Sequence, residues 1–245
     1  MKKFLAIMMV ALMALSLAAC GGDDPAKKSE GVMTYAEYDA AALESQVTIE
    51  AYVQANQSWW EKDGQGLITL YLQDTEGAYF VYELKCPKED ADKMVKGTKL
   101  KITGYKAAWA GEVEIIDATY EILEGSYIAE ATDVTALLAN EEELIKKQNM
   151  LVSFKGMTVE AANDKGVAFL YKWDGSGQDG DDLYFNVSLD GKTYTFTVES
   201  YLTDSSTEVY SAVKNLKVGD KIDMEGFLYW YEGVNPHITA VKAAQ

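Results

Sequence analysis

Short blocks of alternating apolar and polar residues recur along the chain, and the blocks of the first half have counterparts in the second half. The clearest pair is residues 97–105 and 219–227, which lie 122 positions apart and share the pattern G-x-K-[LI]-x-[IM]-x-G-[YF]. Period-two alternation predicts a strand, and the second glycine predicts a bend or bulge within it. The chain is therefore expected to hold two copies of one β-rich unit.

The remaining blocks give each copy four more strands. We expect strands at residues 47–54, 67–72, 77–84 and 113–120 in the first copy and at 151–159, 183–189, 191–198 and 236–241 in the second. A helix is expected between the third and fourth strands of both copies. In the first copy Pro87 opens an acidic segment suited to a first helical turn, and in the second residues 205–208 have the S-x-x-E form of a capping box.

A helix is also expected before each copy. Residues 34–37 form a T-x-x-E capping box that predicts a short helix to about Leu43. Asp133 is a candidate cap for a longer helix, with an apolar stripe at helical spacing. The stripe consists of Val134, Leu137, Leu138, Leu144 and Ile145.

Five strands, with a helix between the third and fourth and a glycine-bent fourth strand after G-[TD]-K, resemble the OB-fold, a small Greek-key barrel. The resemblance implies a mainly β protein with short helices, built as two tandem five-stranded OB-like Greek-key barrels. We assign residues 33–125 to the first OB-like domain and 126–245 to the second. Another small β-barrel or a β-sandwich is the alternative.

The N-terminus has the pattern of an export signal. Two lysines precede an apolar run at residues 4–15, which is too short to span a bilayer, and Leu17-Ala18-Ala19-Cys20 follows. These four residues resemble the bacterial lipobox, which implies that residues 1–19 are cleaved and that Cys20 is lipidated, with palmitate among its acyl chains. Residues 20–32 would then be a lipidated flexible tether. The whole arrangement resembles poorly characterised tandem OB-fold lipoproteins of bacterial envelopes, and it implies an extracytoplasmic protein that is lipid-anchored to the cell membrane.

The charge of the chain is strongly acidic. The formal net charge is −17, and every basic residue is a lysine. Arginine supplies the planar fork that binds phosphates and guanine edges, and nucleic-acid affinity depends on cationic contacts. We therefore expect that nucleic acid is not a partner. With Cys20 committed to lipid, Cys86 has no cysteine left to pair with, so no internal disulfide is expected.

Aromatic residues cluster in the segments where an OB-fold binds its ligands. The resemblance implies binding through the face of strands two and three and through the loops that join strands one to two and four to five. The candidate ligand-binding residues are Trp59, Trp60, Trp109, Tyr171, Trp173, Trp230 and Tyr231. Aromatic rings stack on sugars or bases, or anchor protein interfaces. The alternative is that these rings only close the barrel ends or seal the two units together.

No residue pattern predicts catalysis. His237 is the only histidine, and a structural role on the closing strand is favoured over a catalytic one. Glu112 and Glu114 share a strand face, but paired carboxylates are expected by chance in so acidic a chain. The acidic run at 174–182 is a weak calcium candidate that fails the EF-hand spacing, and Cys86 is expected to be a packed thiol. We expect no enzyme, no cofactor and no metal site.

Three functions follow from these patterns. The leading hypothesis is a membrane-anchored, non-catalytic binding module for a glycan, a peptide or a partner protein of the envelope. One alternative is an OB protein that binds single-stranded nucleic acid. The other is a structural or assembly lipoprotein without a small ligand, in which case the aromatic loops would face each other instead of solvent.

Overall fold

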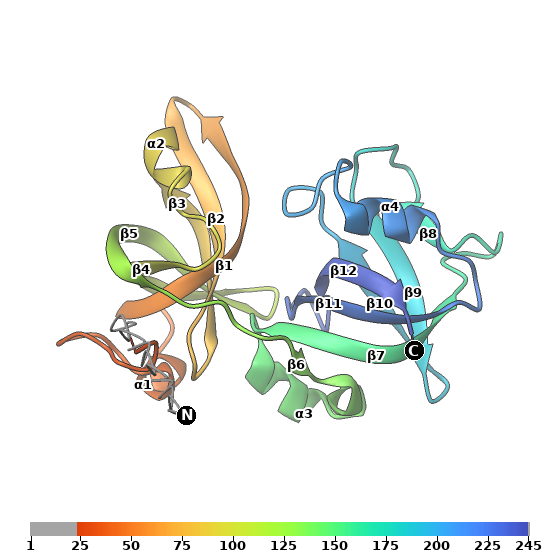
Figure 1. Ribbon diagram of the computed structural model, residues 1–245, viewed down its shortest axis with the longest axis horizontal. Coiled ribbons are helices and arrows are strands. Elements are labelled where there is room, and N and C mark those ends of the chain that lie inside the picture. The colour runs from red at the N-terminus through yellow and green to blue at the C-terminus, as the bar shows by residue number, and fades with distance from the viewer. Residues whose placement is uncertain (1–23, 245) are drawn as a thin grey trace, which may run out of the picture.

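The structure is a computed structural model in which residues 24–244 are described, and it shows two β-barrels side by side (Figure 1). Residues 1–19 and Cys20, the expected signal peptide and lipidation site, lie outside the described residues. Among the helices of residues 24–244, none has the length and apolar character needed to cross a membrane.

The first barrel, barrel 1, is a closed sheet with the strand order β1-β2-β3-β5-β4. Its strands are β1 (Gln46–Lys62), β2 (Gln65–Gln73), β3 (Ala78–Lys85), β4 (Thr98–Trp109) and β5 (Glu112–Ser126). The third and fifth strands pair in parallel, and the other neighbours are antiparallel. Helix α1 (Tyr35–Ala40) precedes the barrel, and α2 (Lys88–Ala91) lies between β3 and β4.

The second barrel, barrel 2, repeats this topology. Its strands are β7 (Leu151–Glu160), β9 (Leu183–Leu189), β10 (Lys192–Val198), β11 (Lys221–Phe227) and β12 (His237–Ala243). The pairing of β7 with β9 closes the sheet, and β10 again pairs in parallel with β12. Helix α4 (Glu208–Lys214) follows β10, while β6 (Thr132–Asp133) and β8 (Phe169–Tyr171) are short additions at β7 and β9. The prediction of a mainly β fold with two tandem OB-like barrels is confirmed.

The glycine shared by the two fourth strands marks a bulge in each barrel. The register of β4 with β5 shifts between Thr103 and Tyr105, around Gly104, and that of β11 with β12 shifts at Gly226. A Cβ atom on Gly226 would lie 2.3 Å from the carbonyl oxygen of His237. Only glycine allows the strands to approach this closely, as the sequence pattern predicts.

The segment between the barrels differs from the predicted long helix. It forms three short pieces, η1 (Thr135–Ala139), α3 (Glu141–Leu144) and η2 (Ile145–Lys147). The helix breaks at Asn140, whose backbone angles are φ −129° and ψ 87° and whose side chain accepts a hydrogen bond from the Glu143 N–H. An asparagine that caps a new helix in this way ends the preceding one. Val134, Leu138 and Leu144 of the apolar stripe are buried, whereas Ile145, after the break, is 41% exposed.

The prediction of a loop between the first two strands of barrel 1 is also wrong. β1 continues to Lys62, and β2 begins at Gln65, so the segment is a β-hairpin with a two-residue turn. Asp63 and Gly64 have positive φ angles of 52° and 75°. These angles are typical of the type I′ turn that Asp-Gly favours between antiparallel strands.

The two barrels are joined by an apolar cluster and by buried hydrogen bonds. Tyr71 of barrel 1 stacks on Phe227 of barrel 2 with ring centroids 4.4 Å apart, and its hydroxyl lies 2.7 Å from His237 Nδ1. The backbone N–H of Leu151 donates to Gln73 Oε1 over 2.8 Å. Because these groups are buried, the junction is a packed interface and not a flexible hinge.

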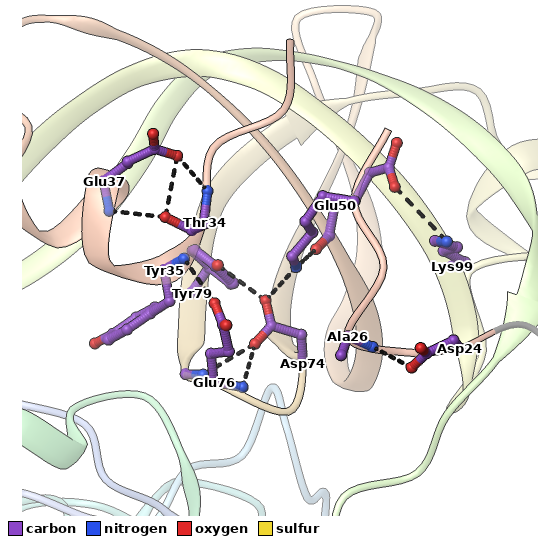
Figure 2. Close-up of polar contacts among 12 residues, drawn as sticks. Asp24, Ala26, Thr34, Tyr35, Glu37, Glu50, Asp74, Glu76, Tyr79 and Lys99 are labelled. Carbon is purple, nitrogen blue, oxygen red and sulfur yellow. Dashed lines mark hydrogen bonds and ion pairs between the residues drawn. The ribbon is translucent and has the colours of Figure 1, made fainter. Parts of the chain in front are cut away.

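The N-terminal segment is bound to barrel 1 within the expected tether. Lys28 donates to Asp74 Oδ2 over 2.6 Å and to the carbonyl oxygen of Glu50 over 2.7 Å. Asp74 also accepts hydrogen bonds from the Tyr79 hydroxyl and from the backbone N–H of Glu76 (Figure 2). This network fixes the chain at Lys28, eight residues after Cys20 in the sequence.

Candidate functional site

Two of the predicted aromatic residues are packing residues in the structure. Trp59 is half-buried, its indole N–H donates to the carbonyl oxygen of Cys86 over 3.1 Å, and its ring covers Gly66. Trp230 is only 4% exposed and belongs to the core of barrel 2. Both rings fill space that the barrels need filled, so their contacts are accounted for without a ligand.

The loops between strands four and five of the two barrels meet each other. The Glu232 N–H donates to the carbonyl oxygen of Ala110 over 2.7 Å, and the rings of Trp109 and Tyr231 lie 5.2 Å apart. Trp109 is 56% exposed and Tyr231 is 45% exposed. The two loops thus present a pair of solvent-facing rings at the junction between the barrels.

A groove of about 360 Å³ lies beside this pair, on the face of barrel 2 that an OB-fold uses for binding. Its walls are Trp173 from the loop between the first two strands of the barrel, Tyr184 from β9, and Tyr231 from the loop before β12. The ring of Trp173 is 76% exposed. A large aromatic side chain this exposed has little packing role and is available to a ligand.

The polar residues of this groove carry no charge. Asn186 of β9 accepts a hydrogen bond at Oδ1 from the Thr195 hydroxyl of β10 over 2.8 Å, and its Nδ2 donates to the carbonyl oxygen of Ala161. Asn235 accepts from the Thr197 hydroxyl over 2.8 Å, which orients its amide group. All nine residues that line the groove are uncharged. The groove therefore presents aromatic rings, amide groups and hydroxyl groups, which suit an uncharged ligand.

Sequence reasoning found Trp173 and Tyr231 but missed Tyr184, Asn186 and Thr195. In β9 the residues Leu183, Phe185 and Val187 are buried, and the alternate residues face outward. The period-two alternation of the sequence could have identified these residues, because the outward side chains of strands two and three form the binding face of an OB-fold.

The other two predicted residues lie elsewhere. Tyr171 is half-buried, packs against the core of barrel 2 and contacts Phe169 edge-on with ring centroids 5.3 Å apart. Trp60 is exposed and lines a second cavity, where barrel 1 faces barrel 2. The seven predicted residues are thus divided among barrel cores, the groove on barrel 2 and the junction.

The acidic run and the single histidine are engaged in structural contacts. Asp174, Asp181 and Asp182 each accept hydrogen bonds from nearby backbone N–H groups, and Asp179 pairs with Lys214 at 2.6 Å. No cluster of three or more metal-binding side chains occurs between residues 24 and 244. Burial lowers the pKa of His237 to about 3, so the ring is neutral.

Cys86 is a buried free thiol. Burial raises its pKa to about 11, with a further contribution from the charge of Asp90. A thiol that holds its proton at neutral pH is a poor nucleophile and metal ligand, and this agrees with the expected packing role.

Comparison with known proteins gives matches at the level of structure only. No protein-family model matches the chain, and no curated protein matches it. A chain of a replication protein A heterotrimer bound to single-stranded DNA is 11% identical with a TM-score of 0.35; the match covers 84% of this chain and 51% of that one, about half its length. A murine DNA-binding protein bound to double-stranded DNA is 13% identical with a TM-score of 0.35, covering 81% and 96%. The p202 HIN1 domain in complex with a 12-mer double-stranded DNA is 13% identical with a TM-score of 0.33, covering 90% and 100%.

These neighbours correct the expectation that nucleic acid is not a partner. That expectation is wrong as an exclusion, because several of the proteins to which this chain is similar are bound to DNA. The expectation was based on the net charge and on the absence of arginine, and both are averages over the whole surface. Within the described part of the chain, no charged residue lines the groove on barrel 2, so the average charge of the surface does not describe this site.

Proposed function

We propose that the protein is a non-catalytic binding protein whose groove on barrel 2 holds a neutral glycan. The observation that carries this proposal is the lining of the groove, which combines the rings of Trp173, Tyr184 and Tyr231 with amide and hydroxyl groups and has no charge. OB-folds bind oligosaccharides as well as oligonucleotides on this face.

The chemistry of a sugar matches this lining. The C–H face of a pyranose ring packs on an aromatic ring, and its hydroxyl groups both donate and accept hydrogen bonds, as the amides of Asn186 and Asn235 also do. The groove volume of about 360 Å³ lies near the lower end of the roughly 300–1,000 Å³ that is usual for small-ligand sites. The exposed ring of Trp109 beside Tyr231 extends the surface for a ligand longer than the groove.

Glycan binding is tested with immobilised bacterial envelope polysaccharides and with soluble oligosaccharides prepared from them. Trp173→Ala and Tyr231→Ala are each expected to weaken binding about tenfold, which corresponds to a loss of about 1.4 kcal/mol of ring contact. Tyr105→Ala is the matched control, because Tyr105 is an exposed ring on β4 of barrel 1. Equal binding by all three variants and the unmodified protein would contradict the assignment of the groove.

Single-stranded nucleic acid is the second candidate ligand, and the position of the groove favours it. The groove occupies the strand face and loops with which OB-folds bind oligonucleotides, and its rings can stack on bases, each worth about 1–3 kcal/mol. Oligonucleotide binding at low salt that disappears in Trp173→Ala would assign the groove to nucleic acid. Binding that is unaffected by this change, or that is absent at low salt, would remove the candidate.

We further propose that Cys20 anchors the protein by lipid to the extracytoplasmic face of the membrane. The support is the pattern of residues 1–20, which resembles a lipobox signal. Lys28, which pairs with Asp74 of barrel 1, follows Cys20 by eight positions in the sequence, so the proposed anchor would hold barrel 1 close to the membrane. Cys20→Ala is expected to abolish labelling with a clickable palmitate analogue and to release the protein from membranes. Labelling that persists in this variant would overturn the anchor.

A further inference from the structure

A second cavity lies between the barrels, separate from the groove on barrel 2. Its volume is about 420 Å³, and residues from both barrels line it. Barrel 1 contributes Trp60, Tyr82 and Glu83, and barrel 2 contributes Glu199, Tyr201 and Tyr229. Among the described residues, the cavity is thus walled by the rings of one Trp and three Tyr residues, by the His237 ring and by two carboxyl groups.

A β-bulge places Tyr82 and Glu83 on the same wall. In an unbroken strand, consecutive side chains point to opposite faces. Here Ile68 pairs with Leu84 and Leu70 pairs with Val81, so Tyr82 and Glu83 together lie opposite the single residue Thr69. Glu83 has a φ of 46°, and its backbone N–H donates to the Thr69 hydroxyl over 3.2 Å. Bulges of this kind redirect side chains next to binding sites, and this one directs the Tyr82 ring and the Glu83 carboxyl group toward the same cavity.

The wall from barrel 2 is equally well fixed. The Glu199 carboxyl accepts hydrogen bonds from the backbone N–H groups of Tyr201 and Leu202 over 3.0 and 2.9 Å. Tyr229 stacks on the neutral ring of His237 with centroids 4.3 Å apart. The two walls are held together where the Ser58 N–H of barrel 1 donates to the carbonyl oxygen of Tyr201 over 3.0 Å. The cavity is therefore preformed, and a ligand does not have to order it.

The charge at this cavity is negative. Glu83 and Glu199 are its acidic residues, and no lysine of residues 24–244 lines it. The nearby ammonium group of Lys62 lies 5.8 Å from the ring centroid of Trp60, so this ring already has a cation over it. Burial raises the pKa of Glu199 to about 7, against the opposing effect of the Tyr201 N–H, and the carboxylate is therefore ionised at pH values above this.

Aromatic rings and carboxylates together form the surroundings that select organic cations. A cation is attracted to the electron-rich faces of the rings, and the carboxylates neutralise its charge. We propose that the cavity between the barrels is a second binding site, which takes an organic cation such as a quaternary ammonium group or the ammonium group of a basic peptide side chain. A neutral sugar has no charge to place against these carboxylates, so this site and the groove on barrel 2 differ in their ligands.

The proposal is tested by calorimetric titration with choline and with its neutral isostere 3,3-dimethyl-1-butanol, at a pH above the pKa of Glu199. Choline is expected to bind about tenfold more tightly than the isostere, because the two differ mainly in charge. Nα-acetyl-lysinamide is titrated in parallel. Tighter binding of choline identifies a free quaternary amine as the source of the cation, and tighter binding of the lysine derivative identifies a peptide. Failure of both cations to bind, or equal binding of the isostere, overturns the proposal.

Four variants locate the site. Trp60→Ala and Glu83→Gln are each expected to weaken choline binding about tenfold, while Lys62→Met removes a competing positive charge and is expected to strengthen it. Glu142→Gln, which removes an exposed negative charge on α3, is the matched control for net charge and is expected to bind as the unmodified protein does. Thermal melts establish that each variant is folded. Choline binding that survives in both Trp60→Ala and Glu83→Gln contradicts the location.

Discussion

Glu112 is a fully buried carboxyl group at the junction between the barrels. Its Oε2 accepts the backbone N–H of Trp230 over 3.0 Å. Its Oε1 is buried and makes no hydrogen bond of ordinary geometry with the described residues. Burial raises the pKa of Glu112 to about 8, against the opposing effects of the Asn149 side chain and the Trp230 N–H. Protonation removes the buried charge, so the folded protein favours neutral Glu112.

This assignment predicts a stability that depends on pH. The folded pKa of Glu112 lies near 8 and above the ordinary value of 4.5, so between these values the folded state holds a proton that the unfolded chain has lost. Stability is then expected to fall as the pH rises through this window, by up to about 1.4 kcal/mol per pH unit, and to level off above it. Glu112→Gln retains an acceptor for Trp230 and supplies an N–H donor.

Urea denaturation at several pH values across this window measures the effect. Glu112→Gln is expected to be more stable than the unmodified protein at the alkaline end, with a smaller fall between the two ends. The exposed Glu142→Gln controls for loss of charge. Parallel stability curves for the unmodified protein and Glu112→Gln would mean that Glu112 is ionised in the folded state.

Single residues show where sequence reasoning stops. Trp59 and Trp60 are adjacent residues of the same type, yet Trp59 packs inside barrel 1 and Trp60 lines the cavity between the barrels. The difference follows from strand alternation, which the Asp63-Gly64 turn signal would have indicated had the segment been interpreted as a hairpin. The environment of Glu112 was not predictable in this way, because its partner Trp230 is 118 residues away and no local pattern connects them.

At the scale of elements, Lys28 binds the start of the segment before α1 to barrel 1, while Met33 at its end bonds to Thr48 and packs on the core. The ammonium group of Lys28 lies 2.6 Å from Asp74 Oδ2, and the Asp74 side chain is fully buried. Lys28→Met leaves this carboxylate without its cation, and we expect a loss of about 1–3 kcal/mol in the free energy of unfolding. Hydrogen exchange of residues 24–33 is expected to accelerate in the same variant. Lys27→Met, one residue earlier and exposed, is the control, and equal exchange in the two variants would show that the ion pair does not fix the segment.

Regular elements were predictable to the extent that their signals were local. The capping box of residues 34–37 forms as predicted, with the Thr34 hydroxyl accepting from the Glu37 N–H, and the glycine bulges fall where the repeat places them. The bulge at Tyr82 and Glu83 gave no such signal, because neither residue is a glycine and the extra residue shows only in the pairing with Thr69. The apolar stripe after Asp133 buries Val134, Leu138 and Leu144 but leaves Ile145 exposed, because the cap at Asn140 ends the helix that the spacing predicts.

At the scale of the molecule, duplication was evident in the sequence and the relation of the copies was not. The repeat predicts two barrels, since each copy carries its own turns, strands and apolar pattern. The contacts that orient the barrels join Tyr71 to His237 and Gln73 to Leu151, between copies, and no periodicity encodes them. Both candidate binding sites depend on how the barrels are oriented. The second cavity is lined by residues of both barrels, and Trp109 of barrel 1 contacts Tyr231, which lines the groove of barrel 2.

The packed junction predicts that the barrels unfold together. Phe227 is 2% exposed and stacks on Tyr71, within a cluster that belongs to neither barrel core. Phe227→Ala removes this ring at a cost of about 3 kcal/mol, most of it from the coupling between barrels. Scanning calorimetry is expected to show one transition for the unmodified protein and for Phe227→Leu, which retains apolar volume, and two transitions for Phe227→Ala. A single transition in Phe227→Ala, shifted to lower temperature, would place the ring in the core of one barrel. Choline binding should also weaken in Phe227→Ala, since the cavity requires both walls.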